Sequence, residues 1–387
     1  MSCARDFYER VFFFLQKFAQ VKIFLYLCSR KMTENYHREI IPSMLRRCKE
    51  WDYKGRGIYM LTLVVRDRQP LLGTLAGDTE NAYIDLSDLG KAVNTEVEGI
   101  PSHFPQIRVL GKQVMPDHLH MLLFVQEPIP VHLTSVVTGF KFGCNRHYWN
   151  SLIEIANTEH PDITDHQRVS CAAEFKEAEK KRGFWDDGYH DRILFHDGQL
   201  DAMIRYIADN PRRLALKRAN PDLFRLHRQT LVGGIACTTL GNIFLADYPQ
   251  RAVLQCSRSL TPADIAALRD ECLAEAANGT IYITAAISEG EKTIARTLRE
   301  AGYPLIILLE NGFPKPDDPH YKYFKPRGVY FEACAAGRLL LVEPSPALLD
   351  RPDIAAQVTT KAGDLPHTSK RYRFLALNAL AAEIAGK

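Results

Sequence analysis

The sequence lacks the cysteine patterns that mark disulfide-rich and zinc-binding proteins. Its nine cysteines lie singly along the chain, none of them in a CxxC spacing, and their number is odd. A disulfide framework needs cysteines that can pair, and a structural zinc site needs clustered ligands. We therefore expect reduced thiols and a cytoplasmic protein.

Long uninterrupted apolar runs are absent too. The one candidate membrane or signal segment, residues 11–27, is interrupted by Lys17 and Lys22, and no small-residue cleavage site follows it. These features argue against a transmembrane helix and against a secretory leader. We expect no membrane partner.

A strong charge of either sign is also missing, because 49 basic and 46 acidic residues leave a formal net charge of only +3. This balance does not by itself support nucleic-acid binding, which must be argued from local clusters. The hydrophobic fraction of 46% is ample for buried cores, and 387 residues exceed one average domain. We predict an N-terminal extension over residues 1–49, a first domain over residues 50–232 and a second domain over residues 233–387.

A hydrophobic stretch with two histidines, residues 114–125, stands out in the first domain. Its hydrophobic composition predicts a strand, in which side chains alternate between the two faces. His118 and His120 then project from one face and Leu119 from the other. Two neighbouring imidazoles suit a divalent metal if further ligands come from elsewhere. An HxH pair in an apolar strand is more often packed or exposed, so the pair alone does not establish a site.

Residues 200–211 have a helical period instead. Apolar residues recur at spacings of three and four, at Leu200, Met203, Ile204 and Ile207. Pro211 is a natural stop for this helix. Tyr206 and Asn210 are four residues apart and therefore share one helical face. If that face lies over the histidine strand, His118, His120 and Asn210 can hold a metal with Tyr206 directed at the same point.

Three blocks of the sequence, taken in this order, resemble the REP-associated tyrosine transposases, which are single-tyrosine transposases with a histidine-hydrophobe-histidine (HUH) motif. The blocks are MPDHLH at residues 115–120, FWDDGYHDRIL at residues 184–194 and YIADNP at residues 206–211. Together the resemblance spans roughly residues 50 to 230. One departure is Asp117, where many members have asparagine, and the resemblance gives this position no catalytic role.

The resemblance implies a ferredoxin-like HUH fold in which Tyr206 is the nucleophile. It also implies that His118, His120 and Asn210 hold Mg²⁺ or Mn²⁺. The expected activity is that of a DNA transposase-type nuclease and strand transferase. It would cleave single-stranded or hairpin DNA and form a 5′-phosphotyrosine. A phenol has an unperturbed pKa of about 10, so deprotonation at neutral pH costs about 4 kcal/mol, which a metal and a polarised phosphate must offset.

Basic and aromatic residues around these blocks are candidates for DNA binding. Basic residues predominate between residues 201 and 229, where a solvated surface is the plain alternative to phosphate binding. The candidates are Lys141, Arg146, Trp185, Arg192, Arg205, Arg212 and Arg213. Tyr189 is a rival nucleophile, but it is less attractive because the residue four positions later, Ile193, offers no metal ligand.

The order of predicted elements gives the fold class. In the first domain, the predicted order of strand, helix, strand, strand, helix and helix suits an α+β fold with an antiparallel sheet and helices on one face. In the second domain, helices over residues 261–277 and 289–301 separate short buried strands, which predicts a smaller α/β Rossmann-like domain. Its loop at residues 286–292 is neither a Walker nor a GxGxxG loop, and Glu289 and Glu291 argue against phosphate binding there. The ligand of this domain stays unknown.

Other functions remain open at this stage. A domesticated, non-catalytic protein would bind DNA hairpins without forming a covalent adduct. A metal-dependent hydrolase built on the HxH pair would need a carboxylate ligand and a water nucleophile. A replication initiator or relaxase would share the tyrosine chemistry. A homodimer is compatible with each of these functions.

Overall fold

The computed structural model describes residues 51–159, 183–196, 198–257, 259–310, 312–313, 326 and 328–386. The predicted N-terminal extension therefore lies outside the described residues. Contacts divide the chain into a first unit that ends at Ala215 and a second unit that begins at Leu216. The predicted boundary at residue 232 would place strand β7 (His227–Val232) in the first domain, whereas its hydrogen bonds join it to the second sheet.

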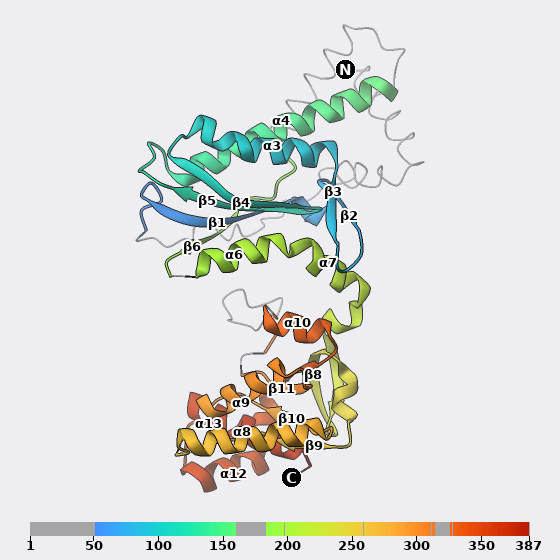
Figure 1. Ribbon diagram of the computed structural model, residues 1–387, viewed down its shortest axis with the longest axis vertical. Helices are drawn as coiled ribbons and strands as arrows, with labels where there is room; N and C mark the ends of the chain where they lie inside the picture. Colours follow the sequence, from blue (N-terminus) through green and yellow to red (C-terminus); the bar gives the residue numbers. More distant parts are fainter. Residues whose placement is uncertain are drawn as a thin grey trace, which may run out of the picture. The chain divides into compact units, whose positions relative to one another are not determined.

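An antiparallel four-stranded sheet in the order β4-β5-β1-β6 forms the centre of the first unit (Figure 1). Its strands are β1 (Gly57–Val64), β4 (Ile107–Met115), β5 (His118–Val125) and β6 (His190–Leu194). A separate hairpin consists of β2 (Gly73–Ala76) and β3 (Tyr83–Leu86). The histidine strand β5 pairs antiparallel with β4, the strand before it in the chain.

Helices cover both faces of this sheet, so the prediction of helices on one face is wrong. Helices α3 (Asp88–His103) and α4 (Leu133–Glu159) cover one face, and α6 (Gln199–Ala208) covers the other (Figure 1). Strand β5 supplies apolar side chains to both sides, Met121 to the α3–α4 side and Leu122 to the α6 side. A sheet that is apolar on both faces must be covered on both.

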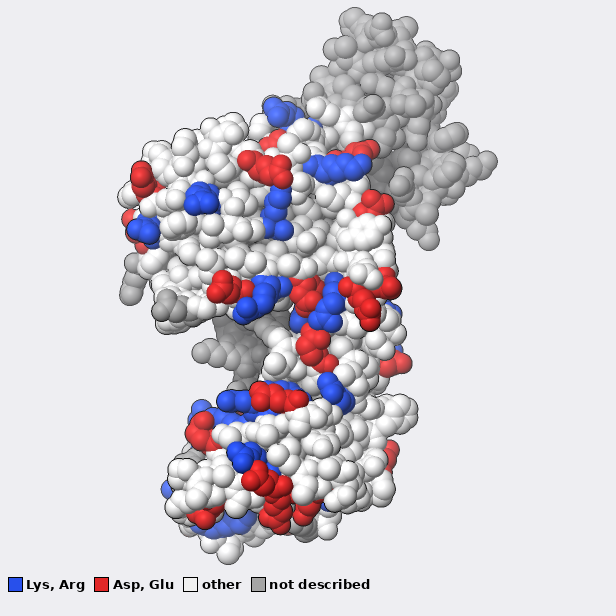
Figure 2. All heavy atoms as spheres, in the orientation of Figure 1, with Lys and Arg blue, Asp and Glu red and all other residues white. Residues whose placement is uncertain are grey.

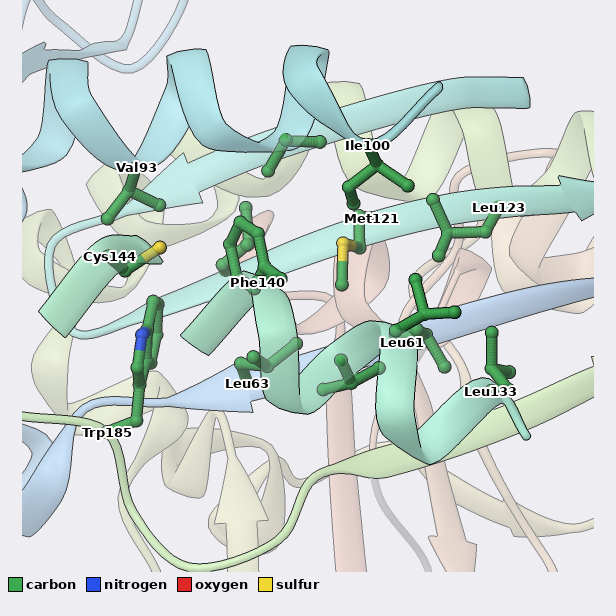
Figure 3. Packing of buried hydrophobic residues seen from close by; sticks show 14 of the residues in the cluster. Leu61, Leu63, Val93, Ile100, Met121, Leu123, Leu133, Phe140, Cys144 and Trp185 are labelled. Atoms are coloured by element: carbon green, nitrogen blue, oxygen red, sulfur yellow. The ribbon is translucent and has the colours of Figure 1, made fainter. Parts of the chain in front are cut away.

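The larger core of the first unit lies between the sheet and helices α3 and α4. Leu61, Leu63 and Met121 of the sheet meet Val93 of α3 and Phe140 of α4 (Figure 3). Full burial of one such side chain stabilises the fold by about 1.5–3 kcal/mol. This packing fixes strand β5, and with it the direction in which the histidines project.

The second unit contains a six-stranded sheet in the order β7-β8-β12-β11-β10-β9. Besides β7, its strands are β8 (Ile235–Gly241), β9 (Arg251–Val253), β10 (Ile281–Thr284), β11 (Leu305–Leu308) and β12 (Leu339–Glu343). Strands β9 to β12 pair in parallel, and β8 pairs antiparallel with β12. The second domain thus has the expected alternation of strands and helices, and its strands β9 to β12 are parallel.

Within the described part of the second unit, six α-helices follow or connect these strands. They are α8 (Pro262–Ala277), α9 (Glu289–Glu300), α10 (Val329–Ala335), α11 (Pro346–Leu349), α12 (Pro352–Ala362) and α13 (Lys370–Ile384). The three crossover helices α8, α9 and α10 pack on one face, and α13 packs on the other. Right-handed crossovers that all advance in the same direction place their helices on the same face. Because the parallel strands run in order without reversal, they form no switch point of the kind at which doubly wound folds bind dinucleotides.

The described residues bear on membrane-spanning helices and on the state of the cysteines. No helix in that part of the chain is long and apolar enough to cross a membrane. Its cysteines are free, buried thiols: Cys144, Cys237, Cys256, Cys272 and Cys334.

Candidate active site

Strand β5 presents both histidines on the sheet face that α6 covers. His118 lies opposite Val64, and His120 lies opposite Thr62, in the antiparallel ladder with β1. Their ring centroids are 4.7 Å apart. Leu119 points into the core on the other side, as the alternation of a strand requires. The predicted pairing of two imidazoles on one face is present.

His118 is oriented by the residue before it. Its Nδ1 lies 2.5 Å from Oδ1 of Asp117, and Oδ2 of Asp117 accepts a hydrogen bond from Nη1 of Arg68 at 3.1 Å. Burial alone would raise the pKa of Asp117, but the hydrogen bonds and positive charges of His118 and Arg68 outweigh it and lower the pKa to about 2. Asp117 is therefore a carboxylate at any ordinary pH and can accept the Nδ1 proton of His118.

His120 is held by a hydroxyl on the neighbouring strand. Its Nδ1 lies 2.8 Å from Oγ1 of Thr62, and the residue is only 6% exposed. Burial, helped by the positive charges of His118 and Arg68, lowers the pKa of His120 to about 3. The imidazole is therefore neutral at physiological pH, which is the form that binds metals.

Both imidazoles thus use Nδ1 for a contact within the protein. When Nδ1 carries the proton, the lone pair of Nε2 is left for a metal, and an outer partner of this kind is what orients ligating histidines in metalloproteins. Within the described residues no three His, Cys, Asp or Glu side chains form a metal cluster. The donor set fits an open site with two imidazoles and an uncharged oxygen, and it does not fit a closed zinc site.

Helix α6 brings the predicted nucleophile to the histidines. The ring centroid of Tyr206 lies 5.6 Å from that of His120. On α6, the apolar residues Leu200, Met203 and Ile207 pack with Met60 and Leu122 of the sheet. This packing turns Tyr206, the residue before Ile207, toward the histidines. Ile204 was expected in the same apolar stripe, but it is 39% exposed and lies outside the contact.

Asn210 begins helix α7 (Asn210–Ala219), directly after α6. Its Nδ2 donates a hydrogen bond to the backbone oxygen of Tyr206 at 2.7 Å, and the residue is buried. This bond leaves the Asn210 side-chain oxygen as an acceptor. Helix α6 ends at Ala208, and Pro211, predicted to stop the helix, lies instead in the first turn of α7, where a missing backbone N–H costs no helical hydrogen bond. The structure brings His118, His120 and Tyr206 together and joins Asn210 to them through the Tyr206 backbone.

Of the predicted DNA-binding arginines, Arg213 lies over the ring of Tyr206. The guanidinium carbon of Arg213 lies 5.7 Å from the centroid of the Tyr206 ring. Asp209 pairs with both arginines, at 2.6 Å from Arg212 and 3.8 Å from Arg213. The predicted basic strip is therefore partly neutralised, and Figure 2 shows basic and acidic side chains interleaved over the first unit.

Arg192 and Arg205 lie on the same side of the sheet as the histidines. Arg192 is opposite Met60 in the β1–β6 ladder, so it faces the α6 side, and its side chain is exposed. Arg205 precedes Tyr206 in α6 and is exposed. His190, opposite Thr62 in the same ladder, lies in one cross-strand row with His120.

Lys141 and Arg146 lie elsewhere, on α4 over the opposite face. Lys141 donates through Nζ to the backbone oxygens of Asp186 and Gly188, and burial lowers its pKa to about 8. Arg146 lies 3.8 Å from Glu96. Both side chains hold structural contacts away from the histidines.

The aromatic candidates of the second block also lie on that opposite side. Trp185 is 3% exposed and packs against Phe140 and Phe184, next to Cys144 (Figure 3). Its ring is covered by protein and offers no face for a base. Tyr189, the rival nucleophile, packs against the same core and has its hydroxyl 3.5 Å from Thr134.

The sequence interpretation missed three residues at the histidines: Thr62, Arg68 and Asp117. Asp117 was dismissed as a departure from the family pattern, although a carboxylate next to a ligating histidine is itself a signal. Thr62 could be found only from the register between β1 and β5. Arg68 contacts Asp117 through a turn after β1, which no local pattern reveals.

In the loop at residues 286–292 of the second unit, a glutamate side chain accepts the backbone hydrogen bonds of the loop. Glu291 is 1% exposed, and its carboxylate accepts hydrogen bonds from the backbone N–H groups of Cys256, Ile287 and Ser288. These are the donors that a phosphate would use at a helix N-terminus. The side chain of Glu291 therefore occupies the anion position of this loop.

Comparisons with known proteins found matches that cover less than half of this chain. No protein-family profile matches it. A curated protein of Haemophilus influenzae, described as an uncharacterized protein, is 26% identical over 189 residues, which are 46% of this chain and 94% of that protein. A solved structure of a REP-associated tyrosine transposase bound to a REP hairpin is 13% identical with a TM-score of 0.24, over 43% of this chain and 72% of that chain. A putative transposase from Deinococcus radiodurans R1 is 16% identical with a TM-score of 0.22, over 43% of this chain and 98% of that chain. These similarities are too weak to assign the chain to a family.

Proposed function

We propose that the first unit is a metal-dependent DNA nuclease and strand transferase of the transposase type, with Tyr206 as the nucleophile. The observation that carries the proposal is the contact between Tyr206 and His120, on the sheet face where His118 also projects. A phenol beside a buried neutral imidazole, with a second imidazole next to it, is a suitable nucleophile beside a proposed metal site.

The residues fit Mg²⁺ or Mn²⁺ held by His118, His120 and Asn210. A bound divalent ion would neutralise charge on the scissile phosphate and orient it for in-line attack. Asp117 and Thr62 keep the two rings in the ligating orientation by holding their Nδ1 atoms. Asn210 ties the helix turn that carries Tyr206, so the nucleophile and the proposed third ligand move as one piece.

The proposed reaction is a transesterification. The Tyr206 hydroxyl oxygen forms a bond to phosphorus, the bond from phosphorus to the 3′-oxygen breaks, and the phenolic proton leaves to solvent. The departing 3′-oxygen takes up a proton and becomes a 3′-hydroxyl, while the 5′-phosphate stays on Tyr206. Because one ester replaces another, a second 3′-hydroxyl can reverse the step without ATP.

Single-stranded or hairpin DNA is the proposed substrate. A recessed tyrosine between a helix and a sheet is reached more easily by a splayed backbone than by a stacked duplex. The proposed phosphate contacts are the exposed Arg192 and Arg205, Arg213 beside Tyr206, and Arg212 next to it in the chain. The resemblance of the three sequence blocks to REP-associated tyrosine transposases agrees with this substrate class.

The alternatives find less support. A hydrolase built on the two histidines needs a carboxylate ligand, but both oxygens of Asp117 are engaged by His118 and Arg68. A non-catalytic hairpin-binding protein has no need for Tyr206 against His120.

Cleavage of end-labelled hairpin oligonucleotides with Mn²⁺ or Mg²⁺ tests the proposal. A label on the 3′ end should become attached to the protein, and a label on the 5′ end should appear in a shorter free strand. Hydrolysis would instead release both labels as free strands. Binding without cleavage would favour the non-catalytic protein.

A further inference from the structure

The turn after β1 holds two residues in an unfavourable backbone conformation. Asp67 and Arg68 both have φ of +53° within the short 3-10 turn Arg66–Arg68. The left-handed region suits glycine, and neither residue is one. Strained backbone of this kind persists where the surrounding structure requires it and clusters at functional sites.

The strained turn places Arg68 against the histidine pair. Its Nη1 donates to Oδ2 of Asp117 at 3.1 Å, and Oδ1 of the same carboxylate lies 2.5 Å from Nδ1 of His118. One carboxylate therefore links the guanidinium to the imidazole. A change at Arg68 acts on the orientation of His118 through a single side chain.

The ion pair does not explain why the turn is strained. The Arg68 side chain is 64% exposed and that of Asp117 is 25% exposed. Exposed ion pairs contribute little to stability because water screens them. A guanidinium has five N–H donors in a rigid fork, and among the described residues Arg68 uses one of them, for Asp117.

We propose that Arg68 binds a backbone phosphate of the nucleic-acid strand and positions His118 through Asp117. This inference rests on the proposed function. A planar, permanently charged fork can hold a carboxylate on one edge and a phosphate on another, which a lysine cannot do with the same geometry. Arg68 thereby couples the arrival of the strand to the orientation of a proposed metal ligand.

A matched pair of variants tests the phosphate contact. Arg68→Gln and Lys91→Gln each remove one positive charge and one exposed ion pair, since the Lys91 side chain is 66% exposed and lies 3.0 Å from Asp88. Lys91 belongs to α3, on the opposite face of the sheet. Both changes are made in the Tyr206→Phe chain so that binding is measured at equilibrium, and thermal melting confirms that each variant is folded.

Binding of a single-stranded hairpin oligonucleotide is followed across a salt series without divalent ions. Loss of one phosphate contact should make the slope of log affinity against log salt shallower by about 0.7 in Arg68→Gln. Lys91→Gln and the charge-preserving Arg68→Lys should keep the parental slope. A slope for Arg68→Gln equal to that of Lys91→Gln would overturn the phosphate contact.

Mn²⁺ titration of the same variants without DNA tests the positioning role. Mn²⁺ should bind more weakly to Arg68→Gln than to Lys91→Gln, because only the former loosens Asp117 and His118. Equal Mn²⁺ affinities would overturn the positioning role. If the parent binds neither DNA nor Mn²⁺, the proposed function fails together with this inference. If the parent binds both and the two glutamine variants behave alike, the inference alone fails.

Discussion

The ring of Tyr206 packs against the ring of His120, with centroids 5.6 Å apart and planes at 61°. One residue comes from α6 and the other from β5, and the contact lies on the sheet face opposite α3 and α4. This contact between a buried neutral imidazole and a phenol is the observation on which the proposed metal site and the proposed nucleophile rest. The following predictions test what this contact implies.

Thr62→Val should weaken binding of Mn²⁺. The substitution keeps the shape of the side chain and removes the oxygen that lies 2.8 Å from Nδ1 of His120. Loss of an outer partner of a ligating histidine reduces metal affinity by about 10- to 100-fold. Titration calorimetry measures the change, and Thr62→Ser, which restores the hydroxyl, should recover most of the affinity. Equal affinities for the valine variant and the parent would show that Thr62 does not orient a ligand.

His120 should make the stability of the metal-free protein depend on pH. Its pKa is about 3 in the folded protein and 6.5 in the unfolded chain, so the unfolded chain binds one more proton between these values. Stability should therefore fall as the pH falls from about 6.5 to about 3, with a contribution of about 1.4 kcal/mol per pH unit. Above 6.5 both states carry a neutral ring and the contribution is constant.

Urea unfolding at several pH values checks this dependence against two variants. His120→Asn should flatten the curve in that window, whereas His103→Asn, at an exposed position of α3, should leave it unchanged. If the free energy of unfolding depended on pH in the same way in the parent and in His120→Asn, His120 could not be a buried imidazole with a lowered pKa.

Two glycines of α3 should respond oppositely to alanine. A Cβ at Gly90 would lie 1.9 Å from the backbone oxygen of Leu72, whereas a Cβ at Gly99 would meet nothing within 4 Å. Gly90→Ala should destabilise the protein by about 1–3 kcal/mol or more, because the helix must move away from the Leu72 backbone. Gly99→Ala should stabilise it by about 0.5–1 kcal/mol, because alanine is the better helix former. Thermal melting distinguishes the two results, and a stable Gly90→Ala protein would mean that α3 packs less closely than described.

Local patterns were sufficient to predict the parts of the site that lie within one element. The hydrophobic run of residues 114–125 predicted a strand with His118 and His120 on one face, and the structure has this strand at His118–Val125, with residues 114–115 at the end of β4. The period of residues 200–211 predicted the helix that the structure has at Gln199–Ala208, whereas Pro211 does not stop the chain from being helical, because it lies within α7. Each of these inferences needed only the geometry of its own element.

Features that depend on distant pairing could not be read from the sequence. The choice of sheet face for α6 depends on apolar side chains of β1 and β5 together, which is why helices were predicted on one face only. Thr62 reaches His120 because of the β1–β5 register, and the two lie far apart in the sequence. Trp185 was a candidate for base stacking because its burial follows from packing with Phe140, which its local sequence does not indicate.

The most direct test of the account is to identify the residue that becomes linked to DNA. The purified protein is incubated with a 3′-labelled hairpin oligonucleotide and Mn²⁺, digested with protease and examined by mass spectrometry, beside Tyr206→Phe and Tyr189→Phe. We predict a phosphonucleotide adduct on the peptide that contains Tyr206, present in Tyr189→Phe and absent from Tyr206→Phe. An adduct on another residue, or cleavage that persists unchanged in Tyr206→Phe, would contradict the assignment of Tyr206 as the nucleophile.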